Sequence, residues 1–250
     1  MSITAWRLAA WVTYDHVGGL VVANLLWALA SLPWLAVAAV LMAAGWAVGG
    51  VWVAVGCLLA AQWVLLSPPT LALCLAASAW LRGRPVQVRL VAASAWSLAL
   101  PAQGAGLLGC LATLVLAVNV SFYTAMGGWL GVVLAGLAIW GALLVGVVSV
   151  SVLPFLALHG GGLAAALRRS LRWLVLRPRA GASLVATTVV TLALGLASGV
   201  GLACGLLAAW AVLATAVVAD SLDWPGGTPP PEVASRGLAD LLRPWAADRR

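Results

Sequence analysis

The residues of this chain that could do acid–base, nucleophilic or metal chemistry are few and scattered. Its four cysteines stand far apart in apolar segments and never form a C-x-x-C pair; they are Cys57, Cys74, Cys110 and Cys204. A metal site needs several ligands at short spacing, so we interpret these thiols as small buried hydrophobic residues. The two histidines, His16 and His159, have only Asp15 as a neighbouring carboxylate. The sequence therefore predicts no catalytic residue, no cofactor and no metal.

Side-chain amides within long apolar stretches are a second kind of candidate. They are Asn24, Gln62 and Gln103. Amides in a lipid environment normally form hydrogen bonds between helices, which contribute about 0.6–2 kcal/mol each. We therefore expect Gln62 and Gln103 to make helix contacts. The alternative is a binding site for a neutral ligand between the three amides.

A basic segment over Gly160–Arg179 is the third candidate. Four leucines recur there at helical spacing with three arginines beside them, and Pro178 ends the helix. The leucines are Leu163, Leu167, Leu171 and Leu174, and the arginines are Arg168, Arg169 and Arg172. This pattern predicts a helix along the inner leaflet, where each Arg adds about 1 kcal/mol of attraction to anionic lipid. The alternative is a helix on which a cytosolic partner docks.

These candidates belong to a chain with the composition of an integral membrane protein. Hydrophobic residues make up 64% and charged residues 8%, whereas ordinary globular chains have roughly 25% charged residues. No Asp, Glu or Arg lies in residues 17–81, 90–167 or 180–219. Charge-free stretches argue against a proton-driven transporter or a channel with a charged filter, both of which place charges in the membrane. We expect the lipid bilayer as partner and no nucleic acid.

Turn residues divide the charge-free stretches into predicted spans, since crossing a bilayer core takes about 20 residues. The turns are expected near Gly45–Gly50, over Asn119–Gly128 and at Ser198–Gly201. The predicted spans are Val17–Leu41, Trp46–Leu66, Trp96–Val118, Trp129–Leu153, Ala182–Ala197 and Leu202–Ala219. The sequence thus predicts an all-α, polytopic transmembrane bundle of six helices with short interfacial amphipathic helices. Five spans are the alternative.

The arginines predict the orientation of these spans. All 13 basic residues are Arg, and with six spans all of them fall on one face. Both termini and the loops Arg82–Arg89 and His159–Arg179 are therefore predicted to be cytoplasmic, and no cleavable signal peptide is expected. The predicted parts are an interfacial helix at 1–16, a transmembrane domain at 17–219 and a Pro-rich cytoplasmic tail with a short helix at 220–250.

Aromatic residues are placed as membrane interfaces favour. Indole rings prefer the headgroup level, where the ring is half apolar and its N–H is hydrated. Six tryptophans lie near ends of predicted spans: Trp11, Trp46, Trp63, Trp80, Trp96 and Trp129. In the helix expected over Ile3–Asp15, the residues Trp6, Ala10 and Tyr14 share one face, which predicts contact with the interface.

Several sequence blocks resemble a known family. Trp11-Val-Thr-Tyr-Asp15 precedes Ala23-Asn-Leu-Leu-Trp-Ala-Leu-Ala-Ser-Leu-Pro33, and Ser67-Pro-Pro-Thr70 leads to Trp80-Leu-Arg-Gly-Arg84. Later blocks are Leu153-Pro-Phe-Leu156, Arg168–Leu171 and Arg177-Pro178. With these blocks the chain resembles, over roughly residues 6–220, the YesL-like family of bacterial membrane proteins, a family of unknown function.

The resemblance implies a multi-pass protein of the bacterial inner membrane that is accessory to a carbohydrate ABC transport system. It supplies no catalytic residue. In its first block, Asn24, Trp27 and Pro33 are expected to form a packing node, because Pro33 frees a carbonyl and kinks the helix. We therefore expect a non-enzymatic accessory protein for neutral-solute transport. The alternatives are an autonomous carrier or channel for a neutral solute, and a structural or sensor membrane protein.

Overall fold

The computed structural model of the chain describes residues 3–198 and 205–220, and all regular structure in this part is α-helical. This confirms the all-α prediction. The helices are α1 (Ile3–Asp15), α2 (Val17–Ala30), α3 (Leu32–Val48), α4 (Val51–Leu65), α5 (Pro68–Leu81), α6 (Val88–Ser97), α7 (Ala99–Met126), α8 (Gly128–His159), α9 (Leu163–Leu176), α10 (Pro178–Ser198) and α11 (Leu206–Asp220). The turn predicted at Ser198–Gly201 and the tail predicted at 220–250 lie, apart from Ser198 and Asp220, outside the described residues.

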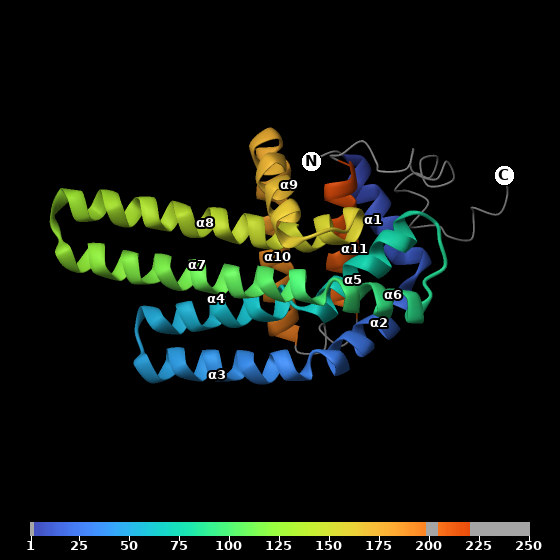
Figure 1. Cartoon of the computed structure of the whole chain (residues 1–250), viewed down its shortest axis with the longest axis horizontal. Coiled ribbons are helices and arrows are strands. Elements are labelled where there is room, and N and C mark those ends of the chain that lie inside the picture. The colour runs from blue at the N-terminus through green and yellow to red at the C-terminus, as the bar shows by residue number, and fades with distance from the viewer. Residues whose placement is uncertain (1–2, 199–204, 221–250) are drawn as a thin grey trace.

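Two antiparallel helical hairpins, α3–α4 and α7–α8, extend side by side and form one end of the molecule (Figure 1). Each hairpin turns at two glycines, Gly49 with Gly50 and Gly127 with Gly128. All four have positive φ, between 59° and 78°, which glycine adopts at little steric cost. The chain therefore reverses within two residues, and both tips point the same way (Figure 1).

The polar turn predicted over Asn119–Gly128 is wrong in its extent, because α7 continues to Met126. The polar side chains of this stretch bond to carbonyls of their own helix. Asn119 Nδ2 donates to the Val115 carbonyl at 2.9 Å, and Thr124 Oγ1 donates to the Val120 carbonyl at 2.8 Å. Such bonds let polar residues remain in a helix without a partner outside it.

Helices α3 and α4 meet through two glycines. A Cβ on Gly45 would lie 2.5 Å from the Trp52 carbonyl oxygen and 3.1 Å from the Cα of Gly56. Small residues permit such close backbone approach between helices in membranes. Gly45 was predicted to belong to a turn, but it lies inside α3 and forms part of this contact.

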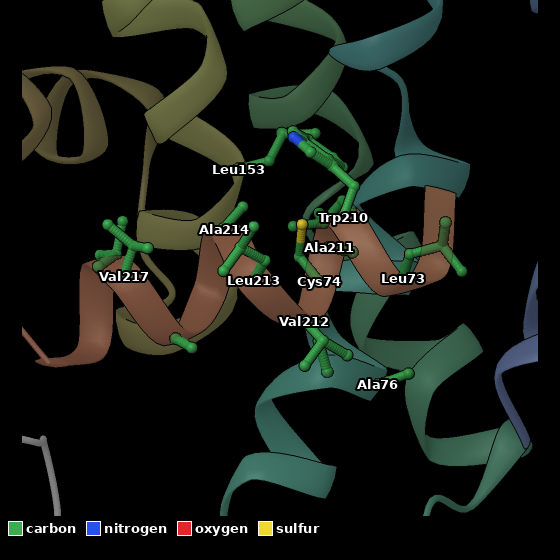
Figure 2. Close-up of a cluster of buried hydrophobic side chains, with 14 of the residues drawn as sticks. Leu73, Cys74, Ala76, Leu153, Trp210, Ala211, Val212, Leu213, Ala214 and Val217 are labelled. Atoms are coloured by element: carbon green, nitrogen blue, oxygen red, sulfur yellow. The ribbon is translucent and has the colours of Figure 1, made fainter. Parts of the chain in front are cut away.

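The rest of the molecule, which we call the base, contains α1, α2, α5, α6, α9, α10, α11 and the end of α8, with α9 and α10 nearest the hairpins (Figure 1). Helix α11 lies at its centre, and every residue from Leu207 to Ala219 except Ala209 is buried. In Figure 2, Trp210 of α11 lies beside Leu153 of α8. A helix that is apolar on all sides is buried either in a protein core or in a membrane, and α11 is buried in the protein.

The N-terminal helix occupies the residues predicted for it, and two aromatic residues of its predicted interfacial face are exposed. Trp6 and Tyr14 are each 45% exposed. Trp11 of α1 is buried. The other buried residues of α1 recur at i, i+3, i+4 and i+7; they are Ala5, Leu8, Ala9 and Val12. This stripe belongs to the same core cluster as α11, because small and aliphatic side chains allow the two helices to approach closely.

Within the described residues, two helices are long and apolar enough to cross a membrane, namely α7 and α8. The number rises to four if two bent pairs each count as one span: α1 with α2, bent by 86°, and α4 with α5, bent by 52°. Six spans are therefore not confirmed. The first predicted span is interrupted at Ser31, and α10 and α11 run across the direction of the hairpins (Figure 1).

Candidate functional site

The two hairpins expose large apolar side chains along most of their length. On α7 a continuous series of these extends from Leu107 to Met126, with Leu100 exposed separately at the start of the helix, and on α8 they extend from Trp129 to Leu144. At the rise of an α-helix these stretches are about 30 Å and about 24 Å long, close to the roughly 30 Å of a bilayer core. An exposed apolar surface of this size and height is typical of a lipid-facing surface.

Charge is confined to the base. Every arginine among the described residues lies in α1, the α5–α6 connection, α6, α9, the α9–α10 connection or the start of α10. The hairpins contain no charged residue from Leu32 to Leu65 or from Ala99 to Leu158. The molecule therefore separates an apolar end from a basic end along its long axis.

Helix α9 is fixed to the base by one face. Its buried residues are Ala166, Ser170 and Trp173. Ser170 forms a hydrogen bond with Ser151 of α8, and the Trp173 ring meets Phe155 edge-on with ring centroids 6.0 Å apart. The predicted leucine stripe is thus not the buried face of α9. A serine and an aromatic side chain bind it instead, because they complement the polar and aromatic residues of α8.

The leucine side of α9 faces a small hollow that we call the α9 groove. Leu167 and Leu171 line it together with residues of α7 and α8. Its other lining residues are Leu66, Ala105, Leu108, Gly109, Ala112, Leu144, Val145, Val148, Ser149 and Val152. The groove has a volume of about 190 Å³, and Leu171 remains 45% exposed at its edge.

The arginines of α9 lie away from its buried face. At 3.6 residues per turn, Arg168 and Arg172 are on the side of the helix opposite Ala166 and Ser170. Arg168, Arg169 and Arg172 are all exposed. Among the residues the structure describes, none of the three pairs with an acidic side chain. Helix α9 therefore has a protein-facing side, a leucine side and a basic side.

The structure joins two of the blocks that carry the family resemblance. Trp27 Nε1 donates a hydrogen bond to Thr70 Oγ1 at 3.0 Å, and Thr70 Oγ1 donates to the Val64 carbonyl at 2.9 Å. Ser67 Oγ donates to the same carbonyl at 2.6 Å. This network links α2 to the start of α5, where the chain turns away from α4. A backbone carbonyl at such a corner needs a side-chain donor, since no helical N–H reaches it.

Of the three residues expected to form a packing node, two are buried and Pro33 is not. Asn24 and Trp27 are buried in α2. Pro33 is exposed in the first turn of α3, a position that proline tolerates because its missing N–H is not needed there. The chain is interrupted two residues earlier, at Ser31.

The three amides do not form a common site. Gln62 Oε1 accepts a hydrogen bond from Thr113 Oγ1 at 2.9 Å, which links α4 to α7. Gln103 Oε1 accepts one from Trp34 Nε1 at 2.7 Å, which links α3 to α7. Asn24 lies in α2 and does not line the cavity that Gln62 lines. Each glutamine thus makes an interhelical hydrogen bond of the expected kind.

A larger cavity, of about 440 Å³, runs along α4, α7, α8 and α10 to Trp210 of α11. Most of its lining side chains are apolar. Two of its polar groups already have partners, since Thr113 bonds Gln62 and Trp210 Nε1 donates to Thr188 Oγ1 at 2.8 Å. The sequence did not predict this cavity, because its residues come from five helices that are distant in the chain.

The cysteines and histidines are separate from one another. Cys57 is exposed, Cys74 is buried and Cys110 is partly buried, on three different helices. His16 stacks on Trp80 with ring centroids 5.7 Å apart, and His159 stacks on Phe155. Among the described residues, no three His, Cys, Asp or Glu side chains come together as metal ligands would.

Comparison of the chain with protein-family models, with curated proteins and with solved structures finds no match. The resemblance to the YesL-like family therefore stays a prediction based on the sequence blocks alone.

Proposed function

We propose that this chain is a multi-pass, non-enzymatic protein of the bacterial inner membrane that assists a transport complex for neutral solutes, as the resemblance to the YesL-like family implies. The observation that carries the membrane part is the division between the apolar hairpins and the basic base. In water, the apolar surface of the hairpins would be exposed to solvent, which is unfavourable. In a bilayer, the same surface contacts the hydrocarbon core.

In this proposal the base lies on the cytoplasmic side. The positive-inside bias places Arg-rich loops in the cytoplasm, and all described arginines are in the base. The α7–α8 hairpin crosses the bilayer, and α3–α4 inserts beside it with its tip directed the same way. The six-span topology predicted from the sequence would require α10 and α11 to cross as well. Their direction across the hairpins supports fewer spans (Figure 1).

The basic side of α9 is the surface proposed for docking of a cytosolic transporter component. Its three arginines are exposed on a helix held by the Ser151–Ser170 contact. A fixed helix loses little entropy when a partner binds, and exposed basic side chains attract an acidic surface.

Affinity purification in mild detergent tests this role. A tagged wild-type chain is expected to retain a transporter permease or its ATPase. Charge reversal at Arg168, Arg169 and Arg172 is expected to abolish retention, whereas reversal at the exposed pair Arg84 and Arg89 is expected to leave it. The proposed accessory role is wrong if the wild type retains no transporter component, or if both variants behave like the wild type.

The alternative of an autonomous sugar carrier finds less support. Sugar sites need several unpaired polar groups, because each substrate hydroxyl must keep its hydrogen bonds. The large cavity is mostly apolar, and Gln62, Thr113 and Thr188 are already bonded to protein.

A further inference from the structure

We propose that the α9 groove and the adjacent arginines form a binding site for one anionic phospholipid of the cytoplasmic leaflet. The proposal rests on the membrane insertion proposed above and adds a specific ligand to it. One acyl chain lies in the groove, and the phosphate group binds Arg168 and Arg172. Because the cytosolic partner proposed above uses the same arginines, the lipid and that partner compete for them.

The groove suits an acyl chain by size and by lining. An apolar cavity of about 150 Å³ is enough to hold a benzene molecule, so the 190 Å³ of the α9 groove accommodates a segment of a methylene chain. Its walls are alanine, glycine and aliphatic side chains with one hydroxyl group, that of Ser149. The rest of the chain would extend along the exposed apolar surface of α7 and α8.

The arginines suit the headgroup by position. Arg168 and Leu171 are i, i+3 neighbours on α9, and Arg168 and Arg172 are i, i+4 neighbours. The half-exposed Leu171 lies at the edge of the groove, so a basic row borders the place where the acyl chain leaves it. Guanidinium groups bind phosphate oxygens in a bidentate manner.

The level of α9 on the molecule agrees with this position. The large exposed side chains of α8 end at Leu144, and the groove begins at Leu144 and ends at Val152. The groove therefore lies at the border between the lipid-facing surface and the basic base, where headgroups would be. A phospholipid places its apolar and anionic parts at the same border.

Native mass spectrometry of the purified full-length chain tests the site, with phosphatidylglycerol and phosphatidylcholine of identical acyl chains added in turn. The wild type is expected to retain phosphatidylglycerol over phosphatidylcholine by about thirtyfold, since each of the two basic side chains at an anionic headgroup contributes about 1 kcal/mol. R168Q/R172Q should remove this preference, and A112F, which fills the groove, should remove retention of both lipids.

Two matched variants serve as controls. R84Q/R89Q makes the same charge change at exposed arginines of the base, and A142F makes the same change in size in the large cavity. Both are expected to bind lipid like the wild type. Equal retention of the two lipids by the wild type, or an equal loss in R84Q/R89Q and R168Q/R172Q, overturns the proposal. The acyl chain does not bind in the α9 groove if inorganic phosphate at equal concentration displaces the lipid, or if A112F retains lipid like the wild type.

The outcome is separable from that of the proposed function. Membrane insertion is measured independently by carbonate extraction of cell membranes, and transporter binding by the affinity purification above. If the chain stays in the carbonate pellet but shows no lipid preference, the lipid site is contradicted and the proposed membrane insertion is not.

Discussion

At the scale of single residues, the polar side chains of this protein hold helices together. Trp27, Thr70 and Ser67 form a buried network at the corner between α4 and α5, and the two glutamines each connect α7 to another helix. Leaving one partner of such a bond unsatisfied costs about 1–3 kcal/mol, more than the net gain of making it. The network therefore has a stronger effect on stability than its size suggests.

Substitution of Thr70 by Val tests this network. The change preserves the shape of the side chain but leaves Trp27 Nε1 and the Val64 carbonyl without their bonds to Thr70. We expect the free energy of unfolding to fall by about 1–3 kcal/mol, measured by thermal or denaturant unfolding in detergent. Thr124→Val is the control, because exposed Thr124 bonds only to carbonyls of α7. Equal effects of the two changes would contradict the role of Thr70.

The sequence predicted these residues in kind but not in arrangement. Amides and hydroxyls in apolar stretches were expected to bond between helices, and Gln62 and Gln103 do so. Their partners, Thr113 and Trp34, could not be identified, since a pairing across more than 50 residues depends on how the helices are packed. The exposed position of Pro33 was missed for the same reason.

At the scale of elements, close backbone contact explains the α3–α4 hairpin. Gly45 and Gly56 have no side chain to separate the two helices. The sequence predicts a turn at Gly45, because glycine is common both in turns and in close helix contacts. Only the packing distinguishes the two uses.

Gly45→Ala is expected to destabilise the hairpin. Its Cβ would lie 2.5 Å from the Trp52 carbonyl oxygen, and such overpacking costs about 1–3 kcal/mol. Gly136→Ala makes the same change within α8, where nothing lies within 4 Å of the added atom. There the higher helix propensity of Ala should stabilise by up to about 1 kcal/mol. Unfolding curves that shift in the same direction for both variants would be inconsistent with this contact.

Helix α11 offers a second test at this scale. Ala211 has no exposed surface and packs among Trp210, Cys74 and neighbouring side chains (Figure 2). Ala211→Leu adds volume to a closed core and is expected to lower stability by about 1–3 kcal/mol. Ala186→Leu on α10, where the side chain is exposed, should have little effect on the unfolding midpoint. A fully tolerated Ala211→Leu would show that α11 is not enclosed in the folded protein.

The sequence predicts a span over Leu202–Ala219, and the structure buries α11 in the base. An apolar stretch without charge is equally favourable in lipid and in a protein core, so hydropathy alone cannot separate a span from an enclosed helix. The same ambiguity hid α5, whose buried face packs in the base. Helix α9 lies where the sequence predicts it, since its arginines and Pro178 mark it, but the sequence predicts no partner for its buried residues Ser170 and Trp173.

At the scale of the whole molecule, apolar and basic surfaces lie at opposite ends. The positions of three tryptophans fit this division: Trp46 and Trp129 are exposed near the hairpin tips, and Trp96 is exposed in α6. The length of α7, about 42 Å, is close to the 40–45 Å of a bilayer with its headgroups. Trp11 and Trp80, predicted for the interface, are buried in the base instead.

The central claim is that the hairpin tips and the arginines of the base lie on opposite sides of the membrane. Labelling of single cysteines with a membrane-impermeant maleimide, in a chain whose native cysteines are replaced by serine or alanine, measures this directly. We expect Thr124→Cys, near the α7–α8 tip, to react in intact cells after the outer membrane is permeabilised. Arg84→Cys is expected to react only once the inner membrane is disrupted as well. Reaction of both positions from the same side would contradict the account.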